Sequence, residues 1–474
     1  MRHRAAIRAL IAVSVGALAL ALAGTAGAAN YIVLYKAQQV PPDAGGQAMF
    51  AGGELVASYD QIGVAIARSD DPSFREKLLR DRRIENVAAT NGYGVRIESV
   101  DSHDPEEELP NTPASDTDNL SGLQWDMRQI HTPEAHAITG GSRTVLAGDI
   151  DTGADPSHPD LAPNIDFANS VSCEGGAPNQ APAAWRDDAG HGTHTAGTIA
   201  AAANGIGIVG TAPNVRLGII DVADPAGFFF PEAVVCGFVW AAEHGFDVTN
   251  NSYFADPFEW NCHNDPVTQA IFKAEHRAIR YAMLNGVTVV ASAGNSNVDL
   301  PRHPPEGNEC IRIPSEIEGV ITVTANGNLG RKAFYSNYGA AVTNVVAPGG
   351  DSTQLTPQAP NGRVLSTWPS YLPCGRSVLD PAAPGVLWCY LQGTSMAAPH
   401  ATGVAALIIS RYGDSDTPQN GKMRPQQVQA YLEHTADPQP CDAANCTGGE
   451  GYNSYYGHGQ VNALRAVTHD TSNR

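Results

Sequence analysis

Basic residues are scarce in this chain of 474 residues, which carries 29 Lys and Arg against 49 Asp and Glu, a formal net charge of −20. A chain this acidic is unsuited to the phosphates of DNA or RNA and to anionic membrane surfaces. Charged residues make up only 16% of the sequence, whereas hydrophobic residues make up 42%. This composition excludes a disordered chain and indicates a globular protein with room for more than one domain.

Long apolar runs are missing after the first thirty residues. At the N-terminus three arginines precede the apolar, alanine-rich segment Ala9–Leu22, and small residues follow up to Ala29. This order predicts a signal peptide over residues 1–29; the alternative is a membrane anchor, for which the run is short. No cysteine stands at the cleavage point, so a lipoprotein anchor is not indicated. We therefore expect a secreted, extracellular protein without a membrane anchor.

The CxxC pairs typical of zinc sites are also absent, although the chain has eight cysteines. An even number of cysteines in an exported chain favours disulfides. Eight cysteines allow roughly a hundred pairings, so the sequence leaves the connectivity open. Two short loops, Cys374–Cys389 and Cys441–Cys446, are plausible disulfides.

Two modules joined by a linker are expected. Residues 30–90 are typical of a small α+β module, and residues 91–120 are acidic, polar and proline-bearing, as in exposed linkers. In the first module we expect a loop after the first strand. Its expected strands are Asn30–Lys36, Gln61–Arg68 and Ile84–Ala88, and its expected helix is Asp71–Arg82.

Residues 121–474 alternate apolar, strand-like runs with helical segments. Near-continuous apolar strands separated by helices predict an α/β fold, a mostly parallel sheet with helices on both faces. The expected strands are Arg143–Ile150, Val215–Val222, Asp247–Tyr253, Val287–Ala293, Val320–Ala325 and Val342–Ala347, and the expected helices include Glu232–Glu243 and Pro266–Asn285.

A Gly-Thr-Ser turn at residues 393–395 leads into an apolar segment of helical character. A serine at a helix start is usually a cap, but it can also be a nucleophile if a base, an orienting carboxylate and an oxyanion donor are near. Asp151 and Asn295 follow apolar strands, and His191 begins a glycine-flanked helix. Taken singly, each has a structural alternative as a turn, cap or packed residue. Zinc at His191 and His194 is disfavoured because their spacing is not HExxH.

Four blocks, "DTGADPSHPDL", "HGTHTAGTIA", "VVASAGNSN" and "GTSMAAPHATGVAAL", resemble the subtilisin-like serine proteases, or subtilases. The resemblance extends over about residues 120–467. It implies that Asp151 orients His191, that His191 is the general acid and base, and that Ser395 is the nucleophile. It also implies an oxyanion hole formed by the Asn295 side chain and the Ser395 backbone N–H. Structural roles are expected for His158, His194 and His400.

The resemblance further implies an endopeptidase that hydrolyses protein or peptide substrates through an acyl-enzyme on Ser395. Residues 30–90 resemble the propeptide of the family, which aids folding and inhibits the enzyme until it is removed. A zymogen and a monomer are therefore expected. Because His191 must be neutral to act as a base, kcat/KM should fall on the acid side with an apparent pKa of roughly 6 to 7.

A structural Ca²⁺ is also implied, since the family wraps this ion in a loop after the histidine helix. Oxygen ligands from carboxylate, amide and carbonyl groups suit Ca²⁺. The alternative is a glycine-rich turn without metal. The implied ligands are the side chains of Gln124, Asp160 and Asn204 and the carbonyls of Ala202, Ile206 and Ile208.

One segment departs from the family. Where subtilases have Ser-Leu-Gly-Gly along the substrate cleft, this chain has Ser252, Tyr253, Phe254 and Ala255. Ser252, Tyr253 and Phe254, with Gly294, are the expected substrate-binding residues. Because Phe254 replaces a glycine, a broad preference for large apolar side chains is not inherited. The departure leaves an alternative, a catalytically dead or narrowly specific secreted binding protein on a protease scaffold.

Overall fold

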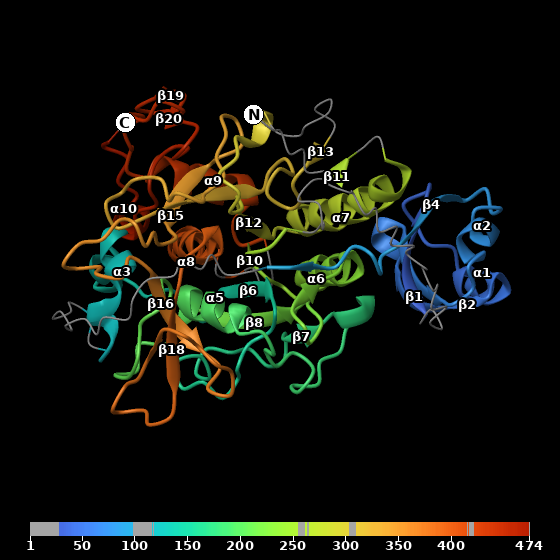
Figure 1. Ribbon diagram of the computed structural model, residues 1–474, viewed down its shortest axis with the longest axis horizontal. Coiled ribbons are helices and arrows are strands. Elements are labelled where there is room, and N and C mark those ends of the chain that lie inside the picture. Colours follow the sequence, from blue (N-terminus) through green and yellow to red (C-terminus); the bar gives the residue numbers. More distant parts are fainter. Residues whose placement is uncertain are drawn as a thin grey trace, which may run out of the picture.

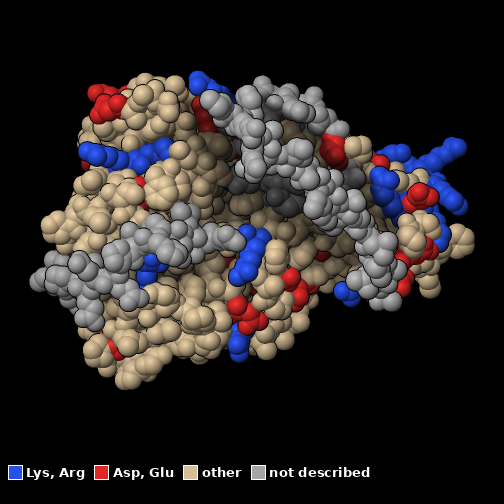
Figure 2. All heavy atoms as spheres, viewed as in Figure 1, with Lys and Arg blue, Asp and Glu red and all other residues tan. Residues whose placement is uncertain are grey.

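The computed structural model describes residues 28–97, 116, 118–254, 261–262, 265–302, 310–414, 416 and 421–473. The predicted signal peptide, apart from its last two residues, and most of the predicted linker lie outside the described residues. None of the helices among the described residues combines the length and the apolar composition that a bilayer span requires. On the face shown in Figure 2, charged side chains are sparse, and several Lys and Arg gather at the end formed by the N-terminal module.

The N-terminal module is a four-stranded antiparallel sheet in the order β2-β3-β1-β4 with two short helices. The expected loop after the first strand instead holds a helix and an extra strand, β2. The helix has two glycines, which lower its propensity, but its alanines pack into the core of the module. The elements are β1 (Ala29–Tyr35), α1 (Ala44–Ala51), β2 (Gly53–Tyr59), β3 (Val64–Ser69), α2 (Phe74–Leu78) and β4 (Ile84–Ala89).

The larger domain is built on a seven-stranded sheet in the order β15-β14-β12-β10-β6-β8-β7, with every pair parallel. Its central strands are buried along their whole length, which explains their near-continuous apolar sequences. The α/β prediction is thereby confirmed. The strands are β6 (Leu146–Asp151), β7 (Val171–Ser172), β8 (Arg216–Asp221), β10 (Val248–Asn251), β12 (Thr288–Ser292), β14 (Ile321–Asn326) and β15 (Val345–Pro348).

Helices cover both faces of this sheet (Figure 1). On one face α5 (His191–Ala200) and α8 (Thr394–Tyr412) share a core with the sheet. On the other, α6 (Pro231–Glu243) and α7 (Pro266–Leu284) form a second core with it. Both α5 and α8 begin at the edge where the parallel strands end, which is where open α/β sheets build their sites.

Smaller elements surround this framework. A three-stranded antiparallel sheet, β16-β18-β17, packs beside α5. The remaining strands are β5 (Val95–Arg96), β9 (Phe228–Phe229), β11 (Asn261–Cys262), β13 (Cys310–Ile311), β16 (Val364–Trp368), β17 (Ser377–Val378), β18 (Leu387–Leu391), β19 (Gly448–Gly449) and β20 (Tyr452–Asn453). The remaining helices are α3 (Trp125–Gln129), α4 (Thr132–His136), α9 (Pro425–His434) and α10 (Ala463–Thr468).

The N-terminal module docks with its sheet against α6 and α7 (Figure 1). Arg277 of α7 donates to the carbonyl of Tyr35 at 2.9 Å and to Glu85 Oε2 at 3.1 Å. On α6, Glu232 Oε1 accepts a hydrogen bond from Asn30 Nδ2 at 2.9 Å. Polar contacts of defined geometry therefore fix the module on the larger domain.

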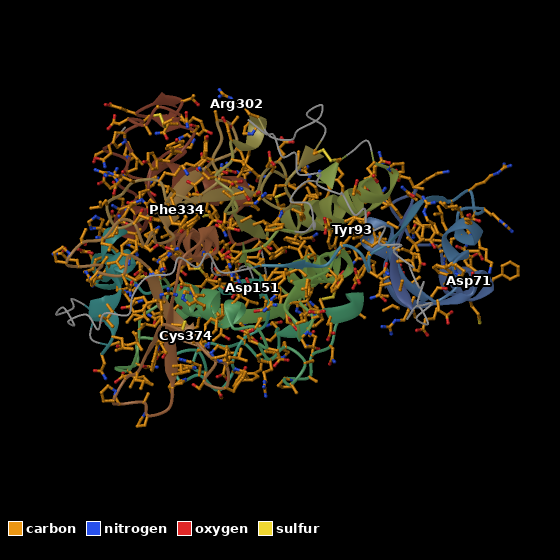
Figure 3. All side chains as sticks on the ribbon, in the orientation of Figure 1. Asp71, Tyr93, Asp151, Arg302, Phe334 and Cys374 are labelled. Carbon is orange, nitrogen blue, oxygen red and sulfur yellow. A yellow bond between two sulfur atoms is a disulfide. The ribbon has the colours of Figure 1, made fainter. Side chains whose placement is uncertain are left out.

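The chain leaves the module toward the centre of the molecule. In Figure 3, Tyr93 lies between the module, marked by Asp71, and Asp151. Beyond Tyr93, β5 pairs antiparallel with β9 of the larger domain. The segment after the module thus runs along the larger domain as an added strand.

Four disulfides join all eight cysteines. The two predicted short loops, Cys374–Cys389 and Cys441–Cys446, are both closed by disulfides. The other bonds are Cys173–Cys236 and Cys262–Cys310, with sequence separations of 63 and 48 residues. Those two pairs depend on the tertiary fold, which is why spacing alone left them open.

Candidate active site

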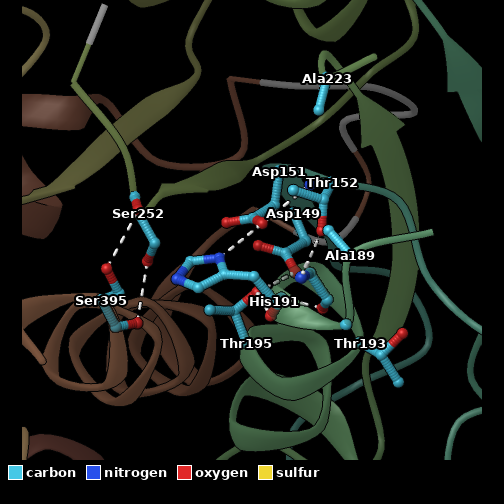
Figure 4. Close-up of polar contacts among 12 residues, drawn as sticks. Asp149, Asp151, Thr152, Ala189, His191, Thr193, Thr195, Ala223, Ser252 and Ser395 are labelled. Atoms are coloured by element: carbon cyan, nitrogen blue, oxygen red, sulfur yellow. Dashed lines mark hydrogen bonds and ion pairs between the residues drawn. The ribbon is translucent and has the colours of Figure 1, made fainter. Parts of the chain in front are cut away.

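The predicted carboxylate and histidine meet at the edge of the sheet (Figure 4). Asp151 is the last residue of β6, and His191 is the first residue of α5. His191 Nδ1 donates to Asp151 Oδ1 at 2.7 Å, and the backbone N–H of Thr152 donates to the same oxygen at 2.8 Å. Because Nδ1 carries the proton, Nε2 of His191 is left as an acceptor, and it makes no hydrogen bond with any described residue.

Ser395 is the second residue of α8 and is only 4% exposed. Its hydroxyl donates to the carbonyl oxygen of Ser252 at 3.1 Å, while Ser252 Oγ donates to the carbonyl of Ser395 at 2.9 Å. Both bonds are drawn in Figure 4. In this arrangement the hydroxyl is turned to Ser252 and not to His191, so the serine–histidine hydrogen bond is not formed.

Asn295 follows β12 and is held in one orientation by the start of α8. Its Oδ1 accepts from the backbone N–H of Thr394 at 2.9 Å and from the Thr394 hydroxyl at 2.8 Å. Since both donors bond the oxygen, the Nδ2 end of the amide points away from these two groups of Thr394. Asn295 lines one small pocket together with His191 and Ser395, and the other lining residues are Ile97, Leu391, Gln392, Gly393 and Met396.

The surroundings of His191 favour its protonated form. Burial lowers the pKa of the imidazole, but neighbouring acidic groups, first of all the charge and the hydrogen bond of Asp151, raise it by more, so the pKa is raised. A buried imidazole with a directly bonded carboxylate is suited to take up a proton and hold it for a short time.

Asp149 is a second buried carboxyl beside the pair, and our sequence prediction missed it. It lies two residues before Asp151 on β6 and accepts hydrogen bonds from Thr195 Oγ1 at 2.7 Å and Asn250 Nδ2 at 2.8 Å. Asn250 Nδ2 also donates to Ser252 Oγ at 3.0 Å. These bonds connect β6, α5 and β10 with the segment beside Ser395. Burial, and then the charge of Asp151, raise the pKa of Asp149 well above its usual value.

Replacing Asp149 with asparagine is expected to make the fold more stable relative to wild type as the pH rises. Because burial raises the pKa of Asp149, the folded carboxyl keeps its proton at pH values where the unfolded one has lost it. Wild-type stability therefore falls as the pH rises through that interval, whereas asparagine does not titrate. The measurement is the difference in Tm between the two chains from pH 4 to pH 9, made in a Ser395→Ala background.

A matched control for that experiment is Asp71→Asn. Hydrogen bonds from Lys77 and Ser73 lower the pKa of Asp71 to about 2, so its ionised form is the favoured one in the folded chain. Its contribution is complete above about pH 5, and from there upward the Tm difference for Asp71→Asn should be flat while that for Asp149→Asn rises. A flat profile for Asp149→Asn as well would contradict the neutral buried carboxyl.

The other histidines of the four sequence blocks are packed and hydrogen-bonded. His158 Nε2 donates to the Leu387 carbonyl, and burial lowers the pKa of His158 to about 4. His194 Nε2 bonds the Cys389 carbonyl, and burial lowers its pKa to about 3. His400 is fully buried and bonds Asp126 at 3.0 Å. His194 therefore faces away from His191, which argues against a zinc site between them.

The predicted substrate-binding residues separate into two groups. Ser252 and Gly294 lie on the two segments that flank Ser395. The ring of Phe254 lies next to the guanidinium of Arg312, and its centroid is 5.0 Å from Arg312 Cζ. Tyr253 points the other way. Its ring is 1% exposed and stacks on that of Phe229 at 5.0 Å. Tyr253 is thus placed to support the cleft rather than to line it.

The residues predicted for Ca²⁺ fit the ion poorly. Asp160 Oδ2 accepts from Ile208 N at 3.0 Å and from Trp388 Nε1 at 2.8 Å. Gln124 Oε1 accepts from Val209 N at 3.0 Å. The indole of Trp388 also packs against the loop, since a Cβ placed on its Gly207 would lie 2.3 Å from Trp388 Cζ2.

Two carboxylates also hold the loop around Gly207 by accepting hydrogen bonds from its backbone N–H groups. Asp118 accepts from the backbone N–H groups of Asn204 and Gly205 at 3.1 and 2.9 Å, and Asp380 accepts from Gly207 N at 2.7 Å. Asn204 Oδ1 accepts from Ile206 N at 3.1 Å. Hydrogen bonds within the protein thus shape the loop, and the carbonyls predicted as ligands, those of Ala202, Ile206 and Ile208, belong to it.

Chelation is therefore expected to leave the stability of the chain unchanged. The Tm of a Ser395→Ala chain in EDTA should lie within about 2 °C of the Tm in millimolar CaCl₂. A bound ion at about a hundred times its Kd would add about 2.7 kcal/mol and, in a chain of this length, raise Tm by about 3 °C. A loss of that size on chelation would establish the calcium site that the resemblance implies.

Comparisons with known proteins agree on one family. Residues 142–459 match the model of the subtilase family. Fervidolysin from Fervidobacterium pennivorans is 30% identical over 392 residues, a match covering 80% of this chain but only 48% of fervidolysin. Subtilisin DY from Bacillus licheniformis is 32% identical over 324 residues, 68% of this chain and 90% of that protein.

Solved structures show the same fold. The epidermin leader peptide processing serine protease EpiP from Staphylococcus aureus superposes with a TM-score of 0.69 over 93% of this chain and 98% of that one, at 22% identity. Because 93% of the chain is longer than the larger domain alone, part of the likeness falls outside that domain. On the family match and the two relatives, this chain belongs to the subtilase family of serine proteases.

Proposed function

We propose that the protein is a secreted serine endopeptidase, made as a zymogen, in which Ser395 is the nucleophile. His191 is the general acid and base, and Asp151 holds its tautomer. The observation that carries the proposal is the 2.7 Å hydrogen bond between Asp151 and His191 beside a pocket that Ser395 and Asn295 also line.

In the proposed reaction Ser395 Oγ leaves the Ser252 carbonyl and gives its proton to His191 Nε2 as it attacks the peptide carbonyl. Asp151 stabilises the imidazolium that forms. The negative charge that develops on the carbonyl oxygen is met by Asn295 Nδ2 and by the Ser395 N–H at the start of α8. His191 then protonates the leaving amine. In the second half of the reaction His191 takes a proton from water as the water attacks the acyl-enzyme, and it returns that proton to Ser395 Oγ.

The midpoint of the acid limb of the kcat/KM profile is expected above pH 6.5, the ordinary pKa of histidine. His191 has to be neutral to accept the Ser395 proton, so activity is lost as the pH falls through its pKa. Since Asp151 and the neighbouring carboxylates raise that pKa, the loss begins at a higher pH than for a free histidine. The measurement is kcat/KM from pH 5 to pH 9; a profile flat over that range would contradict the role of His191.

The zymogen part of the proposal rests on the N-terminal module. It is held by Arg277, and the segment that follows it reaches the candidate site, where Ile97 lines the pocket with His191 and Ser395. A chain in that place blocks access of a substrate. Export fits the sequence of residues 1–29 and the pairing of all cysteines in disulfides. Its partners would then be protein or peptide substrates and its own propeptide, and we expect a monomer.

A dead scaffold kept for binding is the second candidate. The observation that favours it is the Ser395 hydroxyl, which is bonded to Ser252 and not to His191. The deciding experiment is labelling of the purified, secreted chain with a small fluorophosphonate, followed by intact mass and peptide mapping, beside Ser395→Ala. Label on Ser395 of wild type, absent from the variant, supports the peptidase. A folded, processed wild type that takes no label supports the dead scaffold.

A further inference from the structure

Arg312 is a fully buried arginine, 1% exposed, that the sequence blocks did not single out. It follows β13, whose Cys310 is joined to Cys262 by a disulfide. Its guanidinium is packed directly behind Gly294, the residue before Asn295. A Cβ placed on Gly294 would lie 1.6 Å from Arg312 Nη1, and Gly294 has a φ of +95°. Both the lack of room and the left-handed backbone therefore require glycine at this position.

The opposite side of the guanidinium faces the other wall of the cleft. Arg312 Cζ lies 5.0 Å from the centroid of the Phe254 ring, a cation–π contact that holds the planar group. Phe254 belongs to the segment of Ser252, whose carbonyl accepts from Ser395 Oγ at 3.1 Å. The two segments that flank the proposed nucleophile therefore have one guanidinium between them.

This position lies on the acyl side of the reacting bond. The leaving amine has to face His191, because His191 supplies its proton. The acyl part of the substrate then extends past Asn295 and Gly294, on the side away from His191 and toward Arg312. A side chain carried by the acyl residue would then be directed toward the segments of Phe254 and Gly294, and so toward the guanidinium that contacts both.

We propose that Arg312 selects substrates with glutamate or aspartate on the acyl side of the scissile bond, by binding their carboxylate at its guanidinium, beside Phe254 and Gly294. The inference rests on the proposed peptidase function. A guanidinium binds a carboxylate through two parallel, charge-assisted hydrogen bonds, and burial strengthens such bonds. An apolar side chain in the same place would offer the guanidinium no hydrogen-bond acceptor.

Charged groups of the protein near Arg312 include Glu316. Glu316 Oε2 accepts from the backbone N–H of Arg312 at 2.8 Å, and burial raises the pKa of this carboxyl to about 7 although Arg312 lowers it. At neutral pH it is therefore partly protonated. Arg312 Nη1 also donates to the carbonyl of Ala293 at 3.5 Å, which holds the guanidinium beside Gly294.

An acidic residue directly follows the described segment that reaches the site. Val95 pairs with Phe229, and Arg96 with Phe228, so this segment approaches the site in the manner of a substrate strand. Ile97 reaches the pocket of Ser395. The next residue in the sequence is Glu98, which lies outside the described residues. A cut after Glu98 would release the N-terminal module with an acid on the acyl side.

The test is a set of fluorogenic peptides that differ only at the acyl residue, with Glu, Gln, Asp, Leu or Phe. Glutamine is the matched control because it has the shape of glutamate without its charge. We expect kcat/KM for Glu to exceed that for Gln by about a hundredfold or more, the scale for a buried polar group left without its partner. In Arg312→Gln the Glu/Gln ratio should fall to near one, and in Arg312→Lys it should stay well above one.

Two controls separate the possible failures. Fluorophosphonate titration of Ser395 reports the proposed function independently of specificity. If Ser395 is labelled but wild type cleaves Leu or Phe peptides best, with a Glu/Gln ratio near one, the role of Arg312 is wrong and the peptidase stands. If Ser395 takes no label, both fail. If Arg312→Gln does not fold, the wild-type ratio decides alone, together with whether new N-termini in digested casein follow acidic residues.

Discussion

Replacing Asp151 with asparagine is expected to lower kcat by about 10⁴-fold while KM changes little, the scale for a triad carboxylate. Asp151 Oδ1 accepts both from His191 Nδ1 and from Thr152 N. An amide oxygen in that position keeps both bonds but has no charge for the imidazolium. An amide nitrogen there turns His191 to the other tautomer, with its proton on Nε2 and no acceptor for Ser395.

The same substitution is expected to move the acid limb of kcat/KM to lower pH. The charge and hydrogen bond of Asp151 are the main causes that raise the pKa of His191 against burial. Without them burial prevails, and the imidazole stays neutral to a lower pH. The measurement is the pH profile of the residual activity, corrected for active enzyme by fluorophosphonate titration.

Asp149→Asn is the matched control, since it removes a carboxyl group from the same strand two residues earlier. Asp149 is held by Thr195 and Asn250 and makes no hydrogen bond to His191. It cannot replace Asp151, and its own removal should cost less than about tenfold in kcat. Equal losses in the two variants would show that the carboxyls act as one unit, which contradicts the separate roles given to them.

The parallel sheet and the four blocks at its edge were accessible from the sequence because each is a local pattern. Strands such as β6 and β12 are buried on both faces, so their residues are apolar almost without interruption. The ends of such strands and the starts of the helices that follow meet at one edge. The resemblance of the four blocks to the subtilases then implied that Asp151, His191, Asn295 and Ser395 act together.

Other parts of the site depend on contacts between distant segments. Asp149 stands within an apolar strand. An ionisable residue in such a strand was the signal in the sequence that could have identified it. Its partners Thr195 and Asn250 lie 46 and 101 residues further along the chain. Arg312 carries no pattern at all, because its position behind Gly294 follows from the fold and the Cys262–Cys310 bond. Helix α1 was missed since packing outweighs its two glycines.

Replacing Asn295 with alanine is expected to lower kcat by about a hundred- to a thousandfold with little change in KM. The Thr394 N–H and hydroxyl both donate to Asn295 Oδ1, at 2.9 and 2.8 Å, so Nδ2 is the donor available for the oxyanion. That charge exists only in the transition state and the tetrahedral intermediate. Loss of the donor therefore acts on the chemical step and not on the binding of the uncharged peptide.

Asn295→Asp distinguishes this role from a structural one. A carboxylate has the same shape and still accepts from Thr394, so the start of α8 keeps its hydrogen bonds. It also places a negative oxygen where Nδ2 would donate, and the two charges repel. If Asn295 stabilises the oxyanion, the aspartate variant should lose more kcat than the alanine variant although its Tm is closer to wild type. If Asn295 only holds Thr394, the order of the two losses is reversed.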